Sequence, residues 1–280
     1  MSMNEQGKTM KLDQQPIVVK IGGHDIADDA FLTELAIIIR DLAMPVIIVH
    51  GGGAEISELQ ALMGITPQYV DGVRVTDAAS LKVVEMVLCG VVNTRLVRYM
   101  VSAGVDALGM SGVDRGLVQA AQMPHDQRDM GFTGSVHTVR GELLRELLAQ
   151  GIIPVIAPLS LGMDAPVTYN VNADHVAGAV GVAVNAARVV FITNVEGVMV
   201  NGMLQPMLDV AHAHALIANG TISGGMIPKV RTALAALNGG VSRAVITNLH
   251  GLQSGGGTVF THESMNSAST STILNYSERR

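Results

Sequence analysis

The sequence predicts an α/β protein with an open, mainly parallel sheet that helices cover on both faces. Short apolar runs alternate with helical patterns along the chain, and the runs are continuously apolar rather than alternating. The composition agrees with this fold class. With 31 glycines, 3% aromatic residues and no Trp, the core must be filled by Val, Ile, Leu, Ala and Met.

The individual elements follow from the same patterns. Apolar runs of strand length, bounded by Gly, Pro or polar residues, occupy residues 17–21, 46–49, 152–157, 189–193 and 244–247. Apolar residues recur at helical spacing in residues 30–42, 54–63, 78–102, 142–150, 174–186 and 227–237. The segment 117–140 is more polar and alternates with a period of two at residues 134–139. We expect it to form hairpins over one end of the sheet.

Composition and charge restrict the class of protein. The 280 residues are 48% hydrophobic and 15% charged, which suits one large core or two apposed cores. A net charge of −6 without clustered Lys or Arg argues against a nucleic-acid-binding surface. No apolar run reaches the roughly 20 residues of a membrane span. Because no signal-peptide segment is visible either, we expect a cytoplasmic protein.

Cysteine and histidine indicate no redox or metal chemistry. Cys89 is the only cysteine, which excludes an intramolecular disulfide, and its apolar helical surroundings predict a packing role. The nine histidines show no metal-ligand pattern. His212 and His214 are two residues apart, a spacing that points side chains away from each other on a helix. We therefore expect no metal bound by the protein alone.

The chain has no sharp linker, and the best weak break is Asp164-Ala165-Pro166. It separates two halves that each contain a strand–glycine–helix unit. Because ligands of such sheets bind beyond the carboxyl ends of the strands, two halves predict two ligands. We expect a flexible N-terminus at residues 1–15, an N-terminal lobe at 16–165, a C-terminal lobe at 166–260 and a disordered tail at 261–280.

The most informative segment is 46–56, where an apolar strand runs into glycines 51–53 and then into a helix. Glycines let the backbone approach a ligand closely, and the free N–H groups of a helix start point at a negative group. A phosphate is therefore the expected occupant. Lys20 ends an earlier apolar strand just before glycines 22–23 and would suit the same ligand; a solvated strand-end lysine is the alternative.

A second lysine, Lys229, follows Gly224 and Gly225, with Pro228 at a place that the first turn of a helix tolerates. A cation at the positive end of a helix dipole is locally unfavourable. Such an inconsistency is expected where a site must bind concentrated negative charge.

Polar residues at two further helix starts are candidates for substrate binding. Asn172 is an expected N-cap, and capping alone would explain it. Asn170 and Asp174 can direct an amide and a carboxylate toward one cleft, where the carboxylate would hold the two lysines apart and in position. Arg74, also just before an expected helix, can clamp a substrate carboxylate bidentately; a surface salt bridge is the alternative.

The glycine segments match neither a Walker loop nor a Rossmann G-x-G-x-x-G with an acidic partner. In their order along residues 17–260, they resemble the amino acid kinase family, and within it the N-acetyl-L-glutamate kinases. The resemblance rests on KIGG, VHGGGAEI, DGVRVTD, VVEMVLCGVVN, LGMSGVD, YNVNADHVAG, TNVEGV, and GGMIPKVRTAL followed by GGV.

This resemblance implies transfer of the ATP γ-phosphoryl group, with Mg²⁺, to the γ-carboxylate of N-acetyl-L-glutamate, a step of arginine biosynthesis. It implies an αβα sandwich whose N-terminal lobe binds the acyl amino acid and forms a homodimer, while the C-terminal lobe binds ATP. A carboxylate acceptor has a pKa of about 4 and is already ionised at neutral pH, so no general base is expected.

The resemblance also assigns roles to individual residues. Those implied for catalysis are Lys20, Lys229 and Asp174. Those implied for substrate binding are Gly51, Gly52, Gly53, Arg74 and Asn170. Those implied for phosphate or nucleotide binding are Gly22, Gly23, Thr193, Asn194, Gly197, Ser223, Gly225 and Met226.

The chain departs from the family at two places. Asn194 stands where many relatives carry Asp, which removes a charge beside the nucleotide. Residues 248–254 are shorter than the region where arginine usually binds, and the polar N-terminus looks too short for the helix that joins hexamers. We therefore expect a dimer without strong arginine inhibition.

Two alternative functions stay open. A kinase of lysine biosynthesis that phosphorylates a carrier-bound aminoadipate shares most of these motifs. A regulatory module that binds a nucleotide or an amino acid without catalysis is the other alternative, although it would not need both lysines and Asp174.

Overall fold

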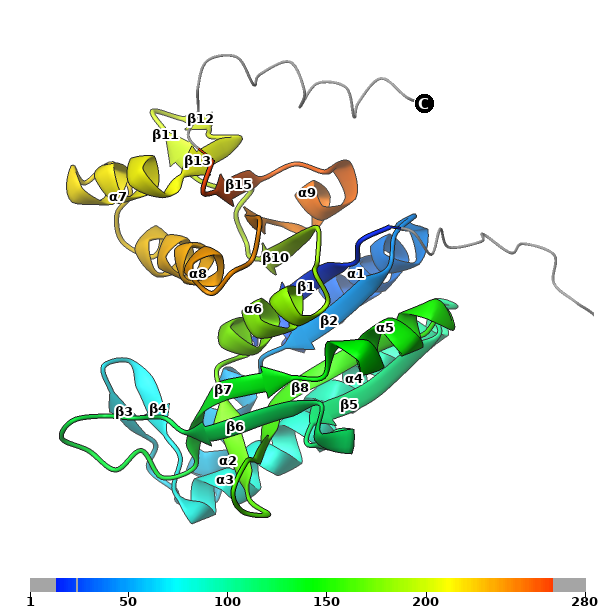
Figure 1. Ribbon diagram of the computed structural model, residues 1–280, viewed down its shortest axis with the longest axis vertical. Coiled ribbons are helices and arrows are strands. Elements are labelled where there is room, and N and C mark those ends of the chain that lie inside the picture. The colour runs from blue at the N-terminus through cyan, green and yellow to red at the C-terminus, as the bar shows by residue number, and fades with distance from the viewer. Residues whose placement is uncertain (1–13, 24, 264–280) are drawn as a thin grey trace, which may run out of the picture.

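The computed structural model describes residues 14–23 and 25–263. Most of the expected flexible N-terminus (1–15) and of the expected disordered tail (261–280) lies outside these residues. Within them the protein is an α/β structure built on one large sheet (Figure 1). The predicted α/β class is confirmed.

The sheet has eleven strands and is parallel through its centre, where β1 pairs with both β2 and β10. Antiparallel pairs occur toward the two edges, between β14 and β15, β6 and β7, and β8 and β9. In spatial order the strands are β13 (Met207–Asp209), β15 (Thr258–Thr261), β14 (Ala244–Thr247), β10 (Arg188–Ile192), β1 (Ile17–Ile21), β2 (Val46–His50), β8 (Ile153–Gly162), β6 (Val118–Gln122), β7 (Thr133–Val139) and β9 (Thr168–Val171), with β5 (Ala107–Gly112) paired to β8.

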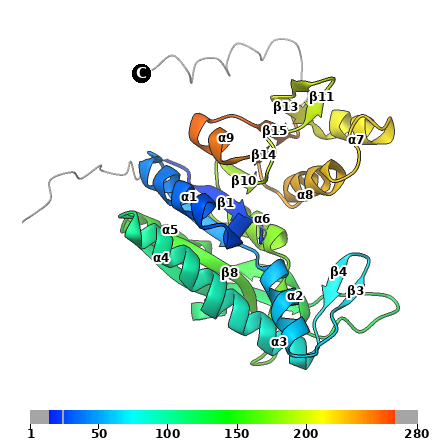
Figure 2. The same ribbon diagram turned by 180° about the vertical axis from the view of Figure 1, so that it is seen from behind.

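Helices lie on both faces of this sheet. Figure 1 shows α5, α6 and α8 in front of the strands, and Figure 2 shows α1, α3 and α4 in front from the opposite side. The helices are α1 (Asp29–Asp41), α2 (Gly53–Leu62), α3 (Ala78–Glu85), α4 (Thr94–Ser102), α5 (Gly141–Ala149), α6 (Ala173–Ala183), α7 (Val210–Ala218), α8 (Met226–Asn238) and α9 (Leu249–Ser254), with short 3₁₀ turns η1 (Asp25–Ala27) and η3 (Asp114–Gly116).

Two apolar cores, one on each face, hold these layers together. Along β1, Val18 faces the core that contains α6 and α8, whereas Val19 and Ile21 face the core that contains α1 and α4. Central strands are buried on both faces, which is why they read as continuous apolar runs. Burial of apolar surface on both sides stabilises the carboxyl ends of β1 and β2, from which the site is built.

Side-chain caps begin several of the helices. Asp28 accepts a hydrogen bond from the Ala30 N–H at 2.8 Å at the start of α1. Asp77 accepts one from the Ser80 N–H at 2.7 Å at the start of α3, and Ser80 holds the pKa of Asp77 below its usual value. Each cap satisfies a backbone donor that the helix itself leaves unpaired.

The expected helix at 78–102 is interrupted. Between α3 and α4 lies a π-helical segment, η2 (Met86–Asn93), which keeps the chain helical but widens its turns. The extra residue of a π turn shifts the side chains that follow, and the buried Asn93 at its end donates to the Val155 carbonyl at 2.9 Å. Periodicity alone cannot separate this segment from an α-helix.

The segment 117–140 also differs from expectation. It does form a hairpin, β6 with β7, but this hairpin belongs to the main sheet, because β6 pairs with β8 and β7 with β9. Expecting it to lie over one end of the sheet was wrong. The separate hairpins are instead β3 (Gln68–Val70) with β4 (Val73–Val75), which projects from the molecule in Figure 1, and β11 (Met199–Val200) with β12 (Met203–Leu204).

None of the helices in the described ranges is both long enough and apolar enough to cross a bilayer.

Candidate active site

Two glycine loops meet at the carboxyl ends of β1 and β2. The Gly51 N–H donates to the Ile21 carbonyl at 3.0 Å, which joins the two loops. A Cβ atom at Gly23 would lie only 2.9 Å from the Gly53 nitrogen and 3.0 Å from the Gly52 nitrogen. Gly22 lies beside them, and α2 begins at Gly53. Glycine is needed at position 23 for this close approach, which places backbone N–H groups of a helix start at the centre of the site.

Lys20 and Asp174 form an ion pair beside these loops. The Lys20 Nζ lies 2.9 Å from Asp174 Oδ1, and the two side chains are 18% and 22% exposed. Lys20 reaches this place from β1, and Asp174 from the first turn of α6, which packs against β1. Asn172 caps α6 by accepting the Asp174 N–H at 2.8 Å. The N-terminus of α6 favours the carboxylate, and the carboxylate orients the lysine.

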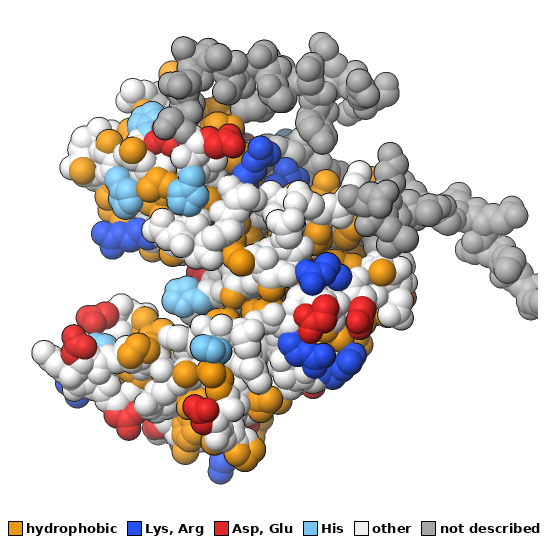
Figure 3. Space-filling view, viewed as in Figure 1, with side chains coloured by type: hydrophobic (Ala, Val, Ile, Leu, Met, Phe, Trp, Pro, Cys, Tyr) orange, Lys and Arg blue, Asp and Glu red, His pale blue; other side chains and the backbone are white. Residues whose placement is uncertain are grey.

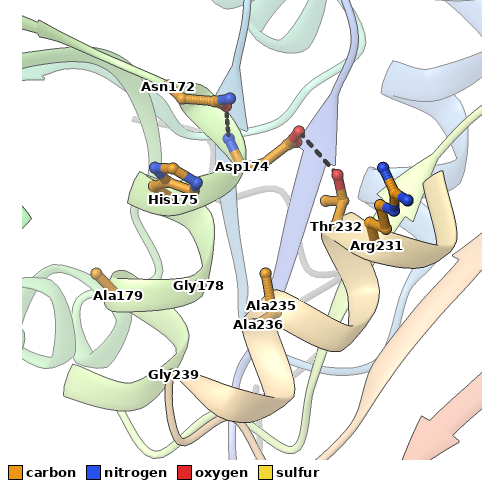
Figure 4. Close-up of a pocket in the computed structure, with 10 residues that line it drawn as sticks. All are labelled: Asn172, Asp174, His175, Gly178, Ala179, Arg231, Thr232, Ala235, Ala236 and Gly239. Atoms are coloured by element: carbon orange, nitrogen blue, oxygen red, sulfur yellow. Dashed lines mark hydrogen bonds between the residues drawn. The ribbon is translucent and has the colours of Figure 1, made fainter. Parts of the chain in front are cut away.

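Helix α8 approaches the same carboxylate from the other side. The Thr232 hydroxyl donates to Asp174 Oδ2 at 3.5 Å, as Figure 4 shows. Lys229 lies one turn earlier on α8, and its Nζ donates to Asn194 Oδ1 at 3.1 Å. Asp174 therefore contacts Lys20 directly and reaches the helix of Lys229 through Thr232. The amide of Asn194, not a carboxylate, holds Lys229.

A cavity of about 480 Å³ opens next to this group and contains Arg74. Arg74 is on β4, and its guanidinium stacks 4.9 Å from the centre of the Tyr69 ring. In the part of the chain that the structure describes, Arg74 is the one charged residue that lines the cavity. The lining residues are Gly53, Ala54, Ser57, Tyr69, Gly72, Val73, Arg74, Thr133, Asn170, Val171 and Asn172. The surface-salt-bridge alternative for Arg74 finds no carboxylate partner among the described residues.

Asn170 forms the opposite polar wall of this cavity. Its Nδ2 donates to the Thr76 hydroxyl at 3.0 Å. Thr76 is itself held by Thr133, whose hydroxyl accepts the Thr76 N–H at 3.0 Å and donates to the Arg74 carbonyl at 2.7 Å. These hydrogen bonds connect β4 with β7 and β9. Arg74 and Asn170 therefore belong to one hydrogen-bonded group of strands.

Asn172 lines this cavity and also a second one, of about 430 Å³, between α6 and α8. Asp174, Thr232 and Arg231 are among the residues that line the second cavity, which Figure 4 shows. Figure 3 shows the surface hollowed between the part that carries α7 and α8 and the part that carries the β3–β4 hairpin. The two cavities thus meet at the start of α6, where the Lys20–Asp174 pair lies.

The candidate nucleotide residues gather around the carboxyl end of β10 and the start of α8. The Thr193 N–H donates to the Thr247 carbonyl at 2.8 Å, and Asn194 follows at once. Ser223 and Gly225 are exposed just before α8, and Met226 begins that helix.

Gly197 is placed differently from the other candidate glycines. It is buried with φ of 156°, and a Cβ there would lie 2.6 Å from the Thr258 hydroxyl. The packing of β15 against this loop therefore also requires glycine at position 197.

Two buried residues that the sequence did not single out support the site. His50, at the end of β2, donates from Nδ1 to the Gly51 carbonyl at 2.9 Å and accepts at Nε2 from Asn93 Nδ2 at 3.0 Å. Full burial lowers the pKa of His50 to about 4, so the ring is neutral. Gln60 is fully buried beside Arg74. Its signal was a polar residue four positions after Ile56 on the buried face of α2.

The model of the amino acid kinase family matches residues 15–248, and the chain belongs to this family. The acetylglutamate kinase of Roseiflexus sp. (strain RS-1) is 52% identical over 249 residues, which cover 89% of this chain and 95% of that protein. The acetylglutamate kinase of Methanopyrus kandleri is 44% identical over 250 residues, which cover 86% and 98% of the two chains.

Solved structures agree with this assignment. Smu.665 from Streptococcus mutans UA159 is 29% identical with a TM-score of 0.73, and the match covers 89% of this chain and 99% of that one. An N-acetylglutamate synthase from Neisseria gonorrhoeae, complexed with coenzyme A and N-acetyl-glutamate, is 25% identical with a TM-score of 0.76. That match covers 93% of this chain and 64% of the synthase.

Proposed function

We propose that this protein transfers the γ-phosphoryl group of ATP to the γ-carboxylate of N-acetyl-L-glutamate, giving N-acetylglutamyl 5-phosphate in arginine biosynthesis. The relatives named acetylglutamate kinases, which match it over nearly their full length, support this function. The observation that carries it is geometric. A cavity opens beside the Lys20–Asp174 pair and the paired glycine loops, and Arg74 is the single cation among the described residues that line it.

The cavity supplies the chemistry for an acyl amino acid with two carboxylates. Arg74 binds the carboxylate that does not react, and the Asn170 amide binds a polar group across the cavity. The backbone of Gly51, Gly52 and Gly53 binds the reacting end. Loss of Arg74 would leave the cavity neutral and weaken binding of a dianion.

Phosphoryl transfer to a carboxylate brings two anions together, so charge neutralisation and positioning are the main requirements. Lys20 and Lys229 neutralise charge on the transferring group from the two sides, and Asp174 holds Lys20 in position. The acceptor is already ionised, since a carboxylate has a pKa of about 4, and no residue has to take up a proton from it.

The residues around β10 and α8 fit a nucleotide. Gly22 and Gly23 leave room for phosphates because a side chain at Gly23 would fill the loop. Thr193, Asn194, Ser223, Gly225 and Met226 form the nucleotide side of the cleft, and the buried Gly197 shapes the loop behind them. Among the described residues no three His, Cys, Asp or Glu side chains lie close enough to hold a metal ion. In the proposed reaction Mg²⁺ arrives bound to the ATP phosphates, which is its usual mode in kinases.

We also propose how the molecule is divided into lobes, where it works and how its copies associate. The fold is a three-layer αβα sandwich of a 16–165 lobe for the acyl amino acid and a 166–260 lobe for ATP, and the enzyme works in the cytoplasm as a homodimer. Exposed apolar side chains on η2 and the neighbouring β5 support a dimer through the first lobe; they are Met86, Val91 and Leu108.

An assay with three acceptors tests the proposed reaction. Hydroxylamine traps acyl phosphates, so we expect a hydroxamate with ATP and N-acetyl-L-glutamate but not with free glutamate or aminoadipate. Turnover with aminoadipate instead would support the lysine-biosynthesis alternative. ATP binding without any hydroxamate would support a regulatory module. Arginine added to the assay should leave turnover nearly unchanged.

A charged residue on η2 should dissociate the dimer. Val91 is 44% exposed, and Val91→Asp would place an unpaired carboxylate in the proposed interface. We expect light scattering after gel filtration to show a dimer for the parent protein and a monomer for the variant. Ile37→Asp on α1, where the side chain is 40% exposed, is the matched control and should stay dimeric. Equal behaviour of the two variants would contradict the proposed interface.

A further inference from the structure

A buried amide lies directly behind the cation of the acyl-substrate cavity. Gln60 is on α2, its side chain has no exposed surface, and its Oε1 accepts a hydrogen bond from Arg74 Nη1 at 2.5 Å. Burying an amide is costly unless its polar atoms are paired. An apolar residue would fit the buried face of α2 at a lower cost in free energy. The presence of an amide there is therefore explained by the group that it holds.

Gln60 belongs to a set of acceptors that hold the Arg74 guanidinium. Arg74 Nη2 donates to the Ser57 hydroxyl at 2.8 Å and to the Gly53 carbonyl at 3.4 Å. All three acceptors are on α2, and Tyr69 covers the guanidinium plane. The guanidinium of Arg74, which comes from β4, is therefore fixed by another element, and among these acceptors Gln60 alone is fully buried.

The direction of the Gln60 amide is itself determined. A guanidinium can only donate, so the atom of Gln60 that faces Arg74 is the oxygen. Gln60 Nε2 then donates to the Ser80 hydroxyl at 2.9 Å. Ser80 is buried at the start of α3, where it also bonds the Asp77 cap. The hydrogen bonds that link Asp77, Ser80 and Gln60 fix the direction of the Gln60 amide. This amide in turn leaves the Arg74 guanidinium one orientation on the side that faces Gln60.

The neutrality of this partner matters for the charge in the cavity. A carboxylate at position 60 would hold Arg74 as well or better. It would, however, cancel the only positive charge that the described residues bring to the cavity wall. An amide orients the guanidinium and leaves its charge available to a ligand.

We propose that Gln60 is a positioning residue for substrate binding, which directs Arg74 toward a carboxylate of the acyl amino acid without neutralising it. This inference rests on the proposed function, in which Arg74 binds that carboxylate. Gln60 acts through Arg74 and touches no reacting atom.

Two substitutions separate the orienting role from the charge. Gln60→Met keeps the shape of the side chain and removes both hydrogen bonds. Gln60→Glu keeps an acceptor for Arg74 and adds a negative charge. We expect both to raise the KM for N-acetyl-L-glutamate about tenfold, because a hydrogen bond to a charged group is lost or the charge is cancelled. The KM for ATP should stay within about twofold of the parent value.

Ile56→Val is the matched control for loss of packing on the same helix. Ile56 is buried one turn before Gln60 and faces the core, not Arg74. It should lower thermal stability without changing either KM. A KM for N-acetyl-L-glutamate within about twofold of the parent value in Gln60→Met or in Gln60→Glu would overturn the inference. An equal rise of the KM for N-acetyl-L-glutamate and the KM for ATP would also overturn it. The same rise of the KM for N-acetyl-L-glutamate in Ile56→Val would do so too.

Calorimetric titration with N-acetyl-L-glutamate separates this inference from the proposed function. If the parent protein neither binds nor phosphorylates N-acetyl-L-glutamate, the proposed function is wrong and the role of Gln60 with it. If the parent is active and the variants bind with unchanged affinity, only the role of Gln60 is wrong.

Discussion

Replacing Lys20 by alanine is expected to lower kcat by about 100- to 1000-fold, the usual loss when one group that stabilises a charged transition state is removed. The loss has two causes. The variant loses the positive charge that, in the proposed reaction, neutralises the transferring phosphoryl group. It also leaves Asp174, 2.9 Å from Lys20 in the parent protein, without this positive partner. Steady-state kinetics with saturating ATP and N-acetyl-L-glutamate measure the effect.

The controls for this prediction address charge and stability. Lys82→Ala removes a lysine from the exposed surface of α3 and should leave kcat unchanged. The double variant Lys20→Ala with Asp174→Asn should lose less activity than the two single losses multiplied, because the two side chains act as one pair. Turnover of Lys20→Ala within about tenfold of the parent protein would show that Lys20 is no part of the phosphoryl-transfer machinery.

The second large effect is on stability at low pH and comes from His50. In the folded protein the ring takes up a proton only near its lowered pKa of about 4, whereas in the unfolded chain it does so near 6.5. The unfolded chain therefore binds more protons between these values, and the contribution of His50 to stability, complete above about 6.5, is lost as the pH falls toward 4. We expect the free energy of unfolding to be lower at pH 4.5 than at pH 7 by about 2 to 3 kcal/mol from this residue.

Urea unfolding of the parent protein and of His50→Gln at pH 7, 5.5 and 4.5 measures this contribution. The glutamine variant lacks the titrating group, so its stability should fall less steeply with pH. His137→Gln, at an exposed position on β7, should keep the parent slope. Identical slopes for the parent and His50→Gln would exclude His50 as the source. The added proton would go to Nε2, which would break the hydrogen bond that this nitrogen accepts from Asn93 Nδ2 at 3.0 Å.

The central fold was predictable because its strands are buried on both faces. The apolar runs at 17–21, 46–49 and 244–247 coincide with β1, β2 and β14 to within one residue. The elements that were not predicted lack such a run. Strand β5 has the sequence ALGMSG, and its glycines interrupt the apolar pattern that would predict a strand. Gly112 lies so close to the Leu159 carbonyl that no side chain fits there. Short hairpins such as β3 with β4 bury too little apolar surface to leave a pattern.

Only some of the site residues could be predicted from the sequence. Lys20 and Arg74 were visible as charges out of place in apolar or turn segments, and Asn172 as a helix cap. The supporting residues Gln60, His50 and Thr232 were not visible, because they act through contacts between residues far apart in the chain. Gln60 lies 14 positions before Arg74, and Thr232 lies 58 positions after Asp174. Local sequence carries no signal for such pairings beyond a polar residue on a buried face.

The place of β1 in the middle of the sheet has a consequence for synthesis on the ribosome. Its neighbour β2 emerges soon after it, but its other neighbour, β10, follows only after residues 51–187 have been made. Until then one side of β1 exposes unpaired backbone groups, a state that promotes association with other nascent chains. Closing this long-range pairing is entropically slow, so docking of β10 should limit the overall folding rate.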